Sequence, residues 1–169
     1  MNIDQTLHML FRQKAWANVD LFAAVATIDA NTHADARHTA IRLLNHVFTV
    51  DQIFRAHLTG VEHGHNATNT VDTPTLEALQ TSVQALDGWY VNYVATTPSA
   101  ALTEEIEFTF TDGKPGRMSR SEMLHHVVLH GSYHRGAVGR IIVQAGGPPL
   151  PDSITSFLHR SEPECRQRA

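Results

Sequence analysis

Four long segments of this chain repeat apolar residues at three- and four-residue spacing, which is the pattern of a helix with one buried face. The segments span residues 4–28, 37–59, 74–97 and 119–145. Long helices with one apolar face bury those faces most economically by packing against one another. The sequence therefore predicts an all-α fold, and specifically a four-helix bundle.

The connections between the predicted helices differ in length. Residues 29–35 form a short polar segment, whereas residues 61–73 form a long one that begins after Gly60, a residue typical of the position after a helix C-terminus. Pro74 then suits the first turn of the third helix. Long crossover connections of this kind argue against a simple up-down-up-down order of the helices.

A change of period precedes the fourth helix. In residues 105–119 apolar and polar residues alternate around an Asp112-Gly113 pair, which predicts a small β-hairpin between the third and fourth helices. Ser119 or Ser121 suits the cap of the fourth helix, with Glu122 in its first turn.

The end of the chain is less regular. A Gly-Gly-Pro-Pro sequence at residues 146–149 ends the fourth helix, and residues 153–159 suit one short further helix. We predict a single bundle domain over residues 1–160, followed by a polar C-terminal tail over residues 161–169.

Composition excludes several classes of function. The net charge of −4 and pI near 6.3 provide no basic surface for nucleic acid, so we expect no nucleic-acid partner. The N-terminus lacks the pattern of a signal peptide, and the sequence has no long apolar run, so we expect a soluble, cytoplasmic protein without a membrane segment. Cys165 is the single cysteine, so any metal site must use nitrogen and oxygen ligands.

Histidine is the compositional outlier, with 12 residues in 169. His126, His130 and His134 recur every four residues in the fourth helix. We expect them to face the core on one stripe with the apolar residues Met123, Val127, Val138 and Ile141. Residues four apart lie on the same helix face, so two of these imidazoles can direct ring nitrogens at one cation about 2 Å from each. All three cannot share one ion, because residues eight apart lie about 12 Å apart along the helix. A further ligand must come from another helix, and His46 lies at the edge of the apolar face of the second.

Two interpretations of this histidine run are open. Each histidine alone is more often a core residue that bonds to carbonyl groups or water. Several imidazoles on one apolar face, with His46 available on a second face, favour a metal site. Two other metal enzymes are disfavoured: a zincin protease lacks its glutamate between the histidines, and only Glu122 and His125 match the motif that a di-iron bundle needs twice.

The chain resembles the DinB/YfiT superfamily of bacterial four-helix-bundle proteins over nearly its whole length. The matching motifs are Trp16-Ala17-Asn18, Asn45-His46-Val47 and, most specific, the segment from His130 to Gly136, which is followed by Gly146-Gly147. The resemblance implies that His46, His130 and His134 bind a divalent metal ion, which leaves His126 as a neighbouring packing or pocket residue. It also implies a homodimer and, as in some members, a thiol S-transferase or isomerase that uses a low-molecular-weight thiol.

A site of three imidazoles leaves coordination positions open for water or a thiol, as in catalytic metal sites. The ion can be zinc, nickel, iron or manganese, because this donor set selects weakly among them. We therefore predict a metal-dependent enzyme, either a thiol S-transferase or a hydrolase, that acts on a small molecule. The alternative is a stress-related, dimeric metal-binding module without turnover.

Other residues beside the expected ligands are weaker candidates. Asp51 is the nearest carboxylate to His46 in sequence, although it lies on a different helix face, and Trp16 is a candidate to line the pocket from the first helix. Tyr133 and Arg135 flank the histidines, but adjacent helix positions are about 100° apart, so we expect both to be structural or to lie at an interface.

Overall fold

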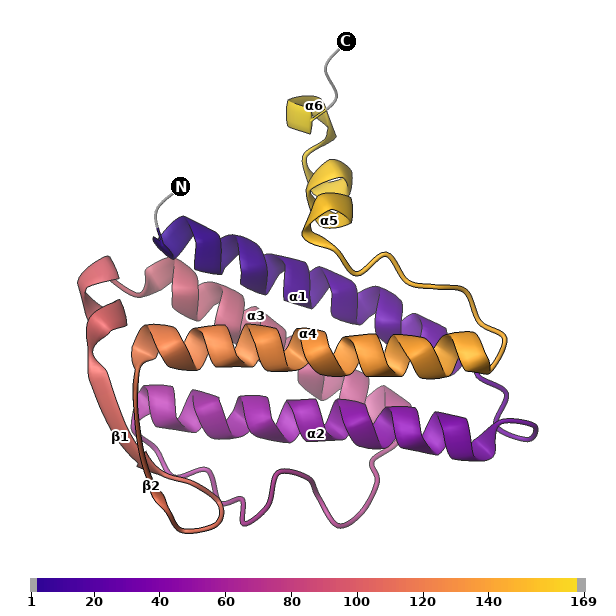
Figure 1. Cartoon of the computed structure of the whole chain (residues 1–169), viewed down its shortest axis with the longest axis horizontal. Coiled ribbons are helices and arrows are strands. Elements are labelled where there is room, and N and C mark those ends of the chain that lie inside the picture. The colour runs from indigo at the N-terminus through magenta and orange to yellow at the C-terminus, as the bar shows by residue number, and fades with distance from the viewer. Residues whose placement is uncertain (1–2, 167–169) are drawn as a thin grey trace.

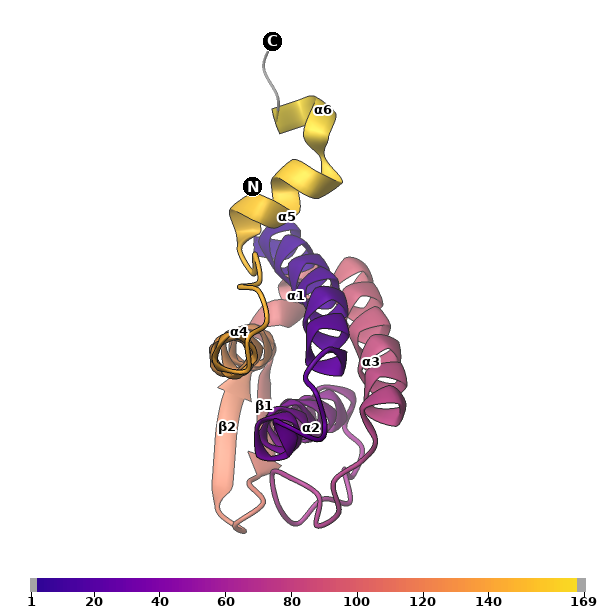
Figure 2. The same cartoon turned by 90° about the vertical axis from the view of Figure 1, so that its right-hand side faces the viewer.

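The computed structural model describes residues 3–166, with side chains from Gln5 onward. Its four long helices are α1 (Ile3–Ala26), α2 (Ala34–Thr59), α3 (Leu76–Thr96) and α4 (Arg120–Gln144). Helix α1 packs most closely on α3, and α2 packs most closely on α4, while α1 also contacts α4. The end-on view in Figure 2 shows the four helices side by side as a bundle, so the predicted four-helix bundle is confirmed.

The helix directions confirm that the order is not up-down-up-down. Helices α1 and α4 run in one direction, and α2 and α3 run in the opposite direction (Figure 1). Since α2 and α3 are parallel, the chain must return along the whole bundle between them. The long polar segment after Gly60 makes this return, along the side of α2 (Figure 1).

The predicted hairpin is also present. A short 3-10 helix, η1 (Ser99–Thr103), leads into strands β1 (Glu105–Thr109) and β2 (Pro115–Ser119), which pair antiparallel. Ile106 and Met118 face each other in the register and pack against the core. Helix α4 then begins with a capping box, in which the Ser119 side chain and Glu122 satisfy each other's backbone N–H groups.

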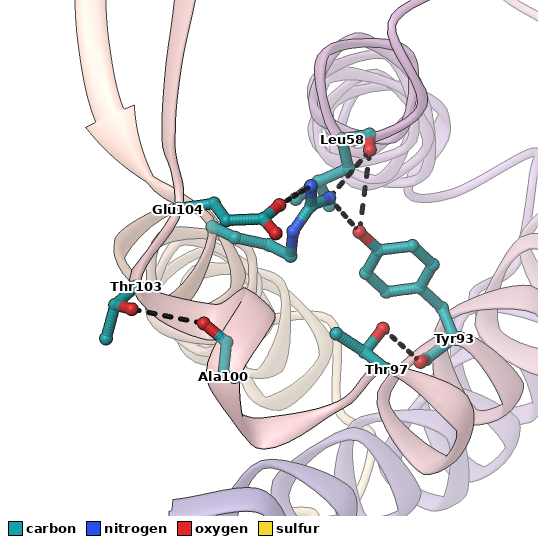
Figure 3. A network of polar contacts seen from close by, with 7 residues as sticks. Leu58, Tyr93, Thr97, Ala100, Thr103 and Glu104 are labelled. Atoms are coloured by element: carbon teal, nitrogen blue, oxygen red, sulfur yellow. Dashed lines mark hydrogen bonds and ion pairs between the residues drawn. The ribbon is translucent and has the colours of Figure 1, made fainter.

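Arg120, the first residue of α4, joins the hairpin end of the bundle to two other helices. Its guanidinium donates to the Leu58 carbonyl oxygen at 2.8 Å and to the Tyr93 hydroxyl, and it pairs with Glu104 at 2.9 Å (Figure 3). These contacts fix the start of α4 against the C-terminal ends of α2 and α3.

Several predicted boundaries were wrong by a few residues. Helix α2 begins at Ala34 rather than residue 37, because Asp29 Oδ1 accepts the backbone N–H groups of Asn31 and Thr32 and so shortens the turn. Helix α1 ends at Ala26, two residues early. Pro74 lies outside α3, because the side chain of Thr75 caps this helix by accepting the N–H of Ala78.

The buried face of α4 differs from the predicted stripe. The prediction placed Met123, Val127 and Val138, together with the three histidines and Ile141, toward the core. Helix α4 packs against both α1 and α2, so its buried face is rotated from the predicted stripe. Besides Met123, Val127 and Val138, this face includes Leu124, Val128, Gly131, Arg135 and Ile142. Of the histidines, His126 is exposed, while His130 and His134 are half-buried at the edge of this face, beside α2.

The C-terminal segment forms two short helices, α5 (Ile154–Ser161) and α6 (Pro163–Arg166). The first confirms the short helix predicted near residues 153–159, and it projects beyond the bundle above α1 (Figure 1). Its buried Phe157 packs on Trp16 of α1. Helix α6 lies within the predicted polar tail, whose residues 167–169 are outside the described part. Within residues 3–166, no helix has the length and apolar character needed to cross a membrane.

Candidate metal centre

Three histidines from two antiparallel helices converge on one point. His130 and His134 lie one turn apart on α4, and His46 faces them from α2. Each offers a ligand atom, and the three atoms lie within 4.8 Å of one another. Across the described residues this is the only group of three or more histidine, cysteine or acidic side chains with such spacing. The arrangement can hold a metal ion.

The imidazole rings are close together but not stacked. The ring centroid of His46 lies 4.9 Å from that of His130 and 4.8 Å from that of His134, with interplanar angles of 67° and 76°. The closest nitrogen atoms are His46 Nε2 and His130 Nε2, at 3.1 Å. Steeply inclined rings with converging nitrogens match a site in which several imidazoles share one cation.

A backbone carbonyl group fixes the tautomer of His46. The Thr68 carbonyl oxygen lies 2.7 Å from His46 Nδ1, and because a carbonyl oxygen only accepts, Nδ1 must carry the proton. In the neutral ring Nε2 then bears a lone pair, and this atom faces His130. Histidines that bind metals are typically oriented by such a hydrogen bond through their other nitrogen.

The two histidines of α4 are held in the neutral form, which is the form that binds metals. Burial, followed by repulsion from His134 and His46, lowers the pKa of His130 to about 3. Burial and His46 lower the pKa of His134 as well. Nδ1 of each ring is buried without a hydrogen-bond partner in the protein. The lone pair on His46 Nε2, which faces His130 Nε2 at 3.1 Å, is consistent with a bound cation, whereas the buried Nδ1 atom of His130 lies on the other side of its ring.

The long connection between α2 and α3 positions Thr68 through side chains of α2. Asn45 donates to Asn69 Oδ1 at 2.5 Å and to Thr70 Oγ1 at 2.6 Å. Asn69 in turn donates to the Arg42 carbonyl oxygen at 3.1 Å. These hydrogen bonds therefore hold the segment that contains Thr68 against α2, the helix that contains His46.

His126 lies next to the three histidines but outside the group. Its ring stacks on Phe54, with centroids 4.5 Å apart, and on His130, at 5.4 Å. The expectation that three histidines at four-residue spacing cannot share one ion agrees with this arrangement. His126 is a packing neighbour of the centre.

Asp51 and Trp16 do not adjoin the three histidines. Asp51 is buried and forms an ion pair with Lys14 at 2.9 Å. Trp16 lines a cavity of about 470 Å³ on the other side of α4, between α1, α4 and the segment that leads to α5. Of the two residues that flank the histidines, Tyr133 is 74% exposed, whereas Arg135 is 4% exposed and pairs with Asp152.

Sequence reasoning missed the buried ion network below the site. Lys14 of α1 lies between Asp51 of α2 and Asp87 of α3, at 2.9 Å and 2.5 Å, and Asn18 donates to the other oxygen of Asp87 at 2.7 Å. A lysine inside the apolar face of α1 was the available signal. The role of Thr68 had no comparable signal, because a backbone carbonyl group is the same in every residue.

Comparison with known proteins gives the family. No curated protein and no solved structure matches the chain. A sequence model described as the DinB family matches residues 1–166, nearly the whole chain. This match, together with the helical bundle and its histidine group, shows that the chain belongs to the DinB family.

Proposed function

We propose that this protein is a metal-dependent enzyme, either a thiol S-transferase or a hydrolase, and that His46, His130 and His134 hold its divalent ion. The observation that carries the proposal is the convergence of the three imidazoles on one point. The hydrogen bond to the Thr68 carbonyl group leaves the lone pair of His46 on Nε2, and this atom faces His130. Membership of the DinB family supports the same site.

Three imidazole ligands leave coordination positions of a divalent ion open for water or a thiol. A divalent ion in such a site lowers the pKa of water or of a thiol and acts as a Lewis acid. Zinc, nickel, iron and manganese all accept nitrogen ligands of this kind, so availability decides which one is bound. The residues of the chain hold the ligand nitrogens in place and keep them neutral.

The chain itself offers no thiol nucleophile near the site, because Cys165 is exposed in α6. A thiol would therefore enter as a substrate. It would lose its proton, its sulfur would form a bond to an electrophilic carbon, and the leaving group would depart with the bonding electrons. In hydrolysis, water takes the place of the thiol. We place this activity in the cytoplasm, where low-molecular-weight thiols remain reduced.

The second candidate is a stress-related metal-binding module without turnover. Two observations favour it. Within the described residues the cavities of about 470 and 560 Å³ are lined by residues other than the three histidines. The histidine group also includes no carboxylate that would serve as a general base.

A thiol-dependent transfer assay distinguishes the two candidates. The metal-loaded protein is incubated with a small thiol and a generic alkyl electrophile, and loss of free thiol is followed. An enzyme gives metal-dependent turnover that His46→Ala abolishes and His38→Ala, an exposed histidine of the same helix, preserves. Metal binding without turnover for any thiol or for water supports the module.

We further propose that the protein forms a homodimer through the outer face of α4. Leu129 and Tyr133 lie one turn apart on this face and are 68% and 74% exposed, and Val143 is 39% exposed. Exposed apolar residues gathered on one helix favour a protein contact. Light scattering should give twice the chain mass for the wild type and for Val71→Asp, a control on an exposed loop, and a smaller mass for Tyr133→Asp.

A further inference from the structure

Two buried charged side chains each leave one polar atom without a hydrogen-bond partner in the protein. Asp51 is 2% exposed and pairs with Lys14 through Oδ2, while its Oδ1 has no partner. Arg135 is 4% exposed and pairs with Asp152 through Nε and Nη2, while its Nη1 has none. Buried polar atoms are nearly always hydrogen-bonded, so a partner is expected for both.

Both side chains line the same internal cavity. Lys14 and Asn18 also line it, and its other walls are apolar side chains of α1, α2 and α3. About 10 Å³ of it is open to the centre of a water-sized sphere, which is roughly the room that one water molecule needs. One of the two unsatisfied atoms is an acceptor and the other is a donor. A water molecule is both, and a cation would be repelled by Arg135.

We propose that one ordered water molecule occupies this cavity, donates a hydrogen bond to Asp51 Oδ1 and accepts one from Arg135 Nη1. The pKa of Asp51 supports the proximity of the two residues, because the charge of Arg135 is among the interactions that lower it. The water completes one continuous polar network across all four long helices and the segment before α5. Its members in order are Asn18, Asp87, Lys14, Asp51, the water, Arg135, Asp152 and Gln13.

The network lies against the turn of α4 that carries the candidate metal ligands. Gly131 follows His130, and a Cβ atom at Gly131 would lie 3.3 Å from both Lys14 Cε and Arg135 Nη1. Arg135 directly follows His134. The water therefore joins α2 to this turn from the core side. This positioning role rests on the proposed function, whereas the water site itself does not depend on a metal.

A crystal structure of the metal-free wild type at about 1.5 Å resolution tests the site directly. We expect one density peak at hydrogen-bond distance, roughly 2.6–3.2 Å, from both Asp51 Oδ1 and Arg135 Nη1. A cavity without density, or a direct contact between Asp51 and Arg135, would overturn the proposal. Because the protein is metal-free, this result does not depend on whether the histidine centre binds a metal.

A pair of valine substitutions on α2 gives a second test in solution. Val47 lines the cavity, whereas Val50 is buried on the same helix and does not. Val47→Ile would displace the water and leave two charged atoms unsatisfied, so its Tm should fall roughly 2–10 °C further than that of Val50→Ile. If the cavity is dry, filling it would raise the Tm of Val47→Ile above that of Val50→Ile, and the proposal fails.

Discussion

His46 Nε2 and His130 Nε2 lie 3.1 Å apart, although the two residues are 84 positions apart in the sequence. Helices α2 and α4 bring them together, and the Thr68 carbonyl group orients the first of them. Without a metal, such a pair shares one hydrogen bond when His130 Nε2 carries the proton. In the proposed metal-bound state, both nitrogens would serve as ligands.

Removal of the metal should lower thermal stability. A ligand that binds only the folded chain stabilises it by RT ln(1 + [L]/Kd), which is about 2.7 kcal/mol at a hundredfold excess over Kd. We expect chelation to lower the Tm of the metal-loaded wild type and to leave His130→Ala unchanged, as measured by differential scanning calorimetry. An unchanged Tm in a wild type shown to have lost its metal would contradict a role of the ion in stability.

Asn69→Ala should weaken metal binding without removing a ligand. Asn69 links Asn45 to the Arg42 carbonyl oxygen and so holds the segment that contains Thr68. Loss of such an outer contact typically weakens metal affinity about 10- to 100-fold. Competition with a coloured chelator measures this, and Asn66→Ala, an exposed asparagine of the same segment, is the control. Equal affinities for the two variants would show that the segment does not position His46.

Alanine substitution at two glycines of α4 should change the free energy of unfolding in opposite directions. At Gly131 a Cβ atom would lie 3.3 Å from Lys14 Cε and Arg135 Nη1, both of which are held by ion pairs, so Gly131→Ala should destabilise by about 1–3 kcal/mol. At Gly136 a Cβ atom meets nothing within 4 Å, so Gly136→Ala should stabilise by up to about 1 kcal/mol. Urea unfolding of both variants measures the difference. A stabilising Gly131→Ala would mean that Lys14 and Arg135 are not fixed.

Asp51 should make stability depend on pH. Burial raises the pKa of Asp51 to about 6, against the opposing effect of Lys14, whereas an unfolded aspartate has a pKa of about 3.9. Between these values the folded chain binds more protons, so this group's contribution to the free energy of unfolding is present below pH 3.9 and is lost as pH rises through 6. The free energy of unfolding of the metal-free wild type, minus that of Asp51→Asn, should therefore decrease on the order of 2 kcal/mol from pH 4 to pH 7. A difference independent of pH would place the pKa of Asp51 near its unfolded value.

The sequence predicted the helices and the hairpin because each leaves a local pattern, and the resemblance to the DinB/YfiT superfamily singled out the three histidines. Apolar spacing marks α2 and α4, alternation marks β1 and β2, and four-residue spacing marks His130 and His134. The rotation of α4 was not predictable in this way, because it depends on α4 contacting α1 as well as α2. For the same reason His126 was wrongly placed toward the core.

The polar network could not be assembled from the sequence either. The helical sequence pattern does not show which partners Lys14 and Arg135 have. Their ion pairs with residues of other segments depend on how the helices are rotated in the bundle. The same holds for the Thr68 carbonyl group, which only the course of the long connection brings to His46. Long-range geometry, rather than residue type, determines both features.

Metal content is the most direct test of the proposed centre. Elemental analysis should be made on untagged wild type and on His130→Ala, after incubation with zinc or nickel and removal of unbound ion. We predict about one divalent ion per chain in the wild type and little in the variant, as expected for a site of three imidazoles. A wild type without metal would contradict the account and would show that His46 and His130 form a hydrogen-bonded pair.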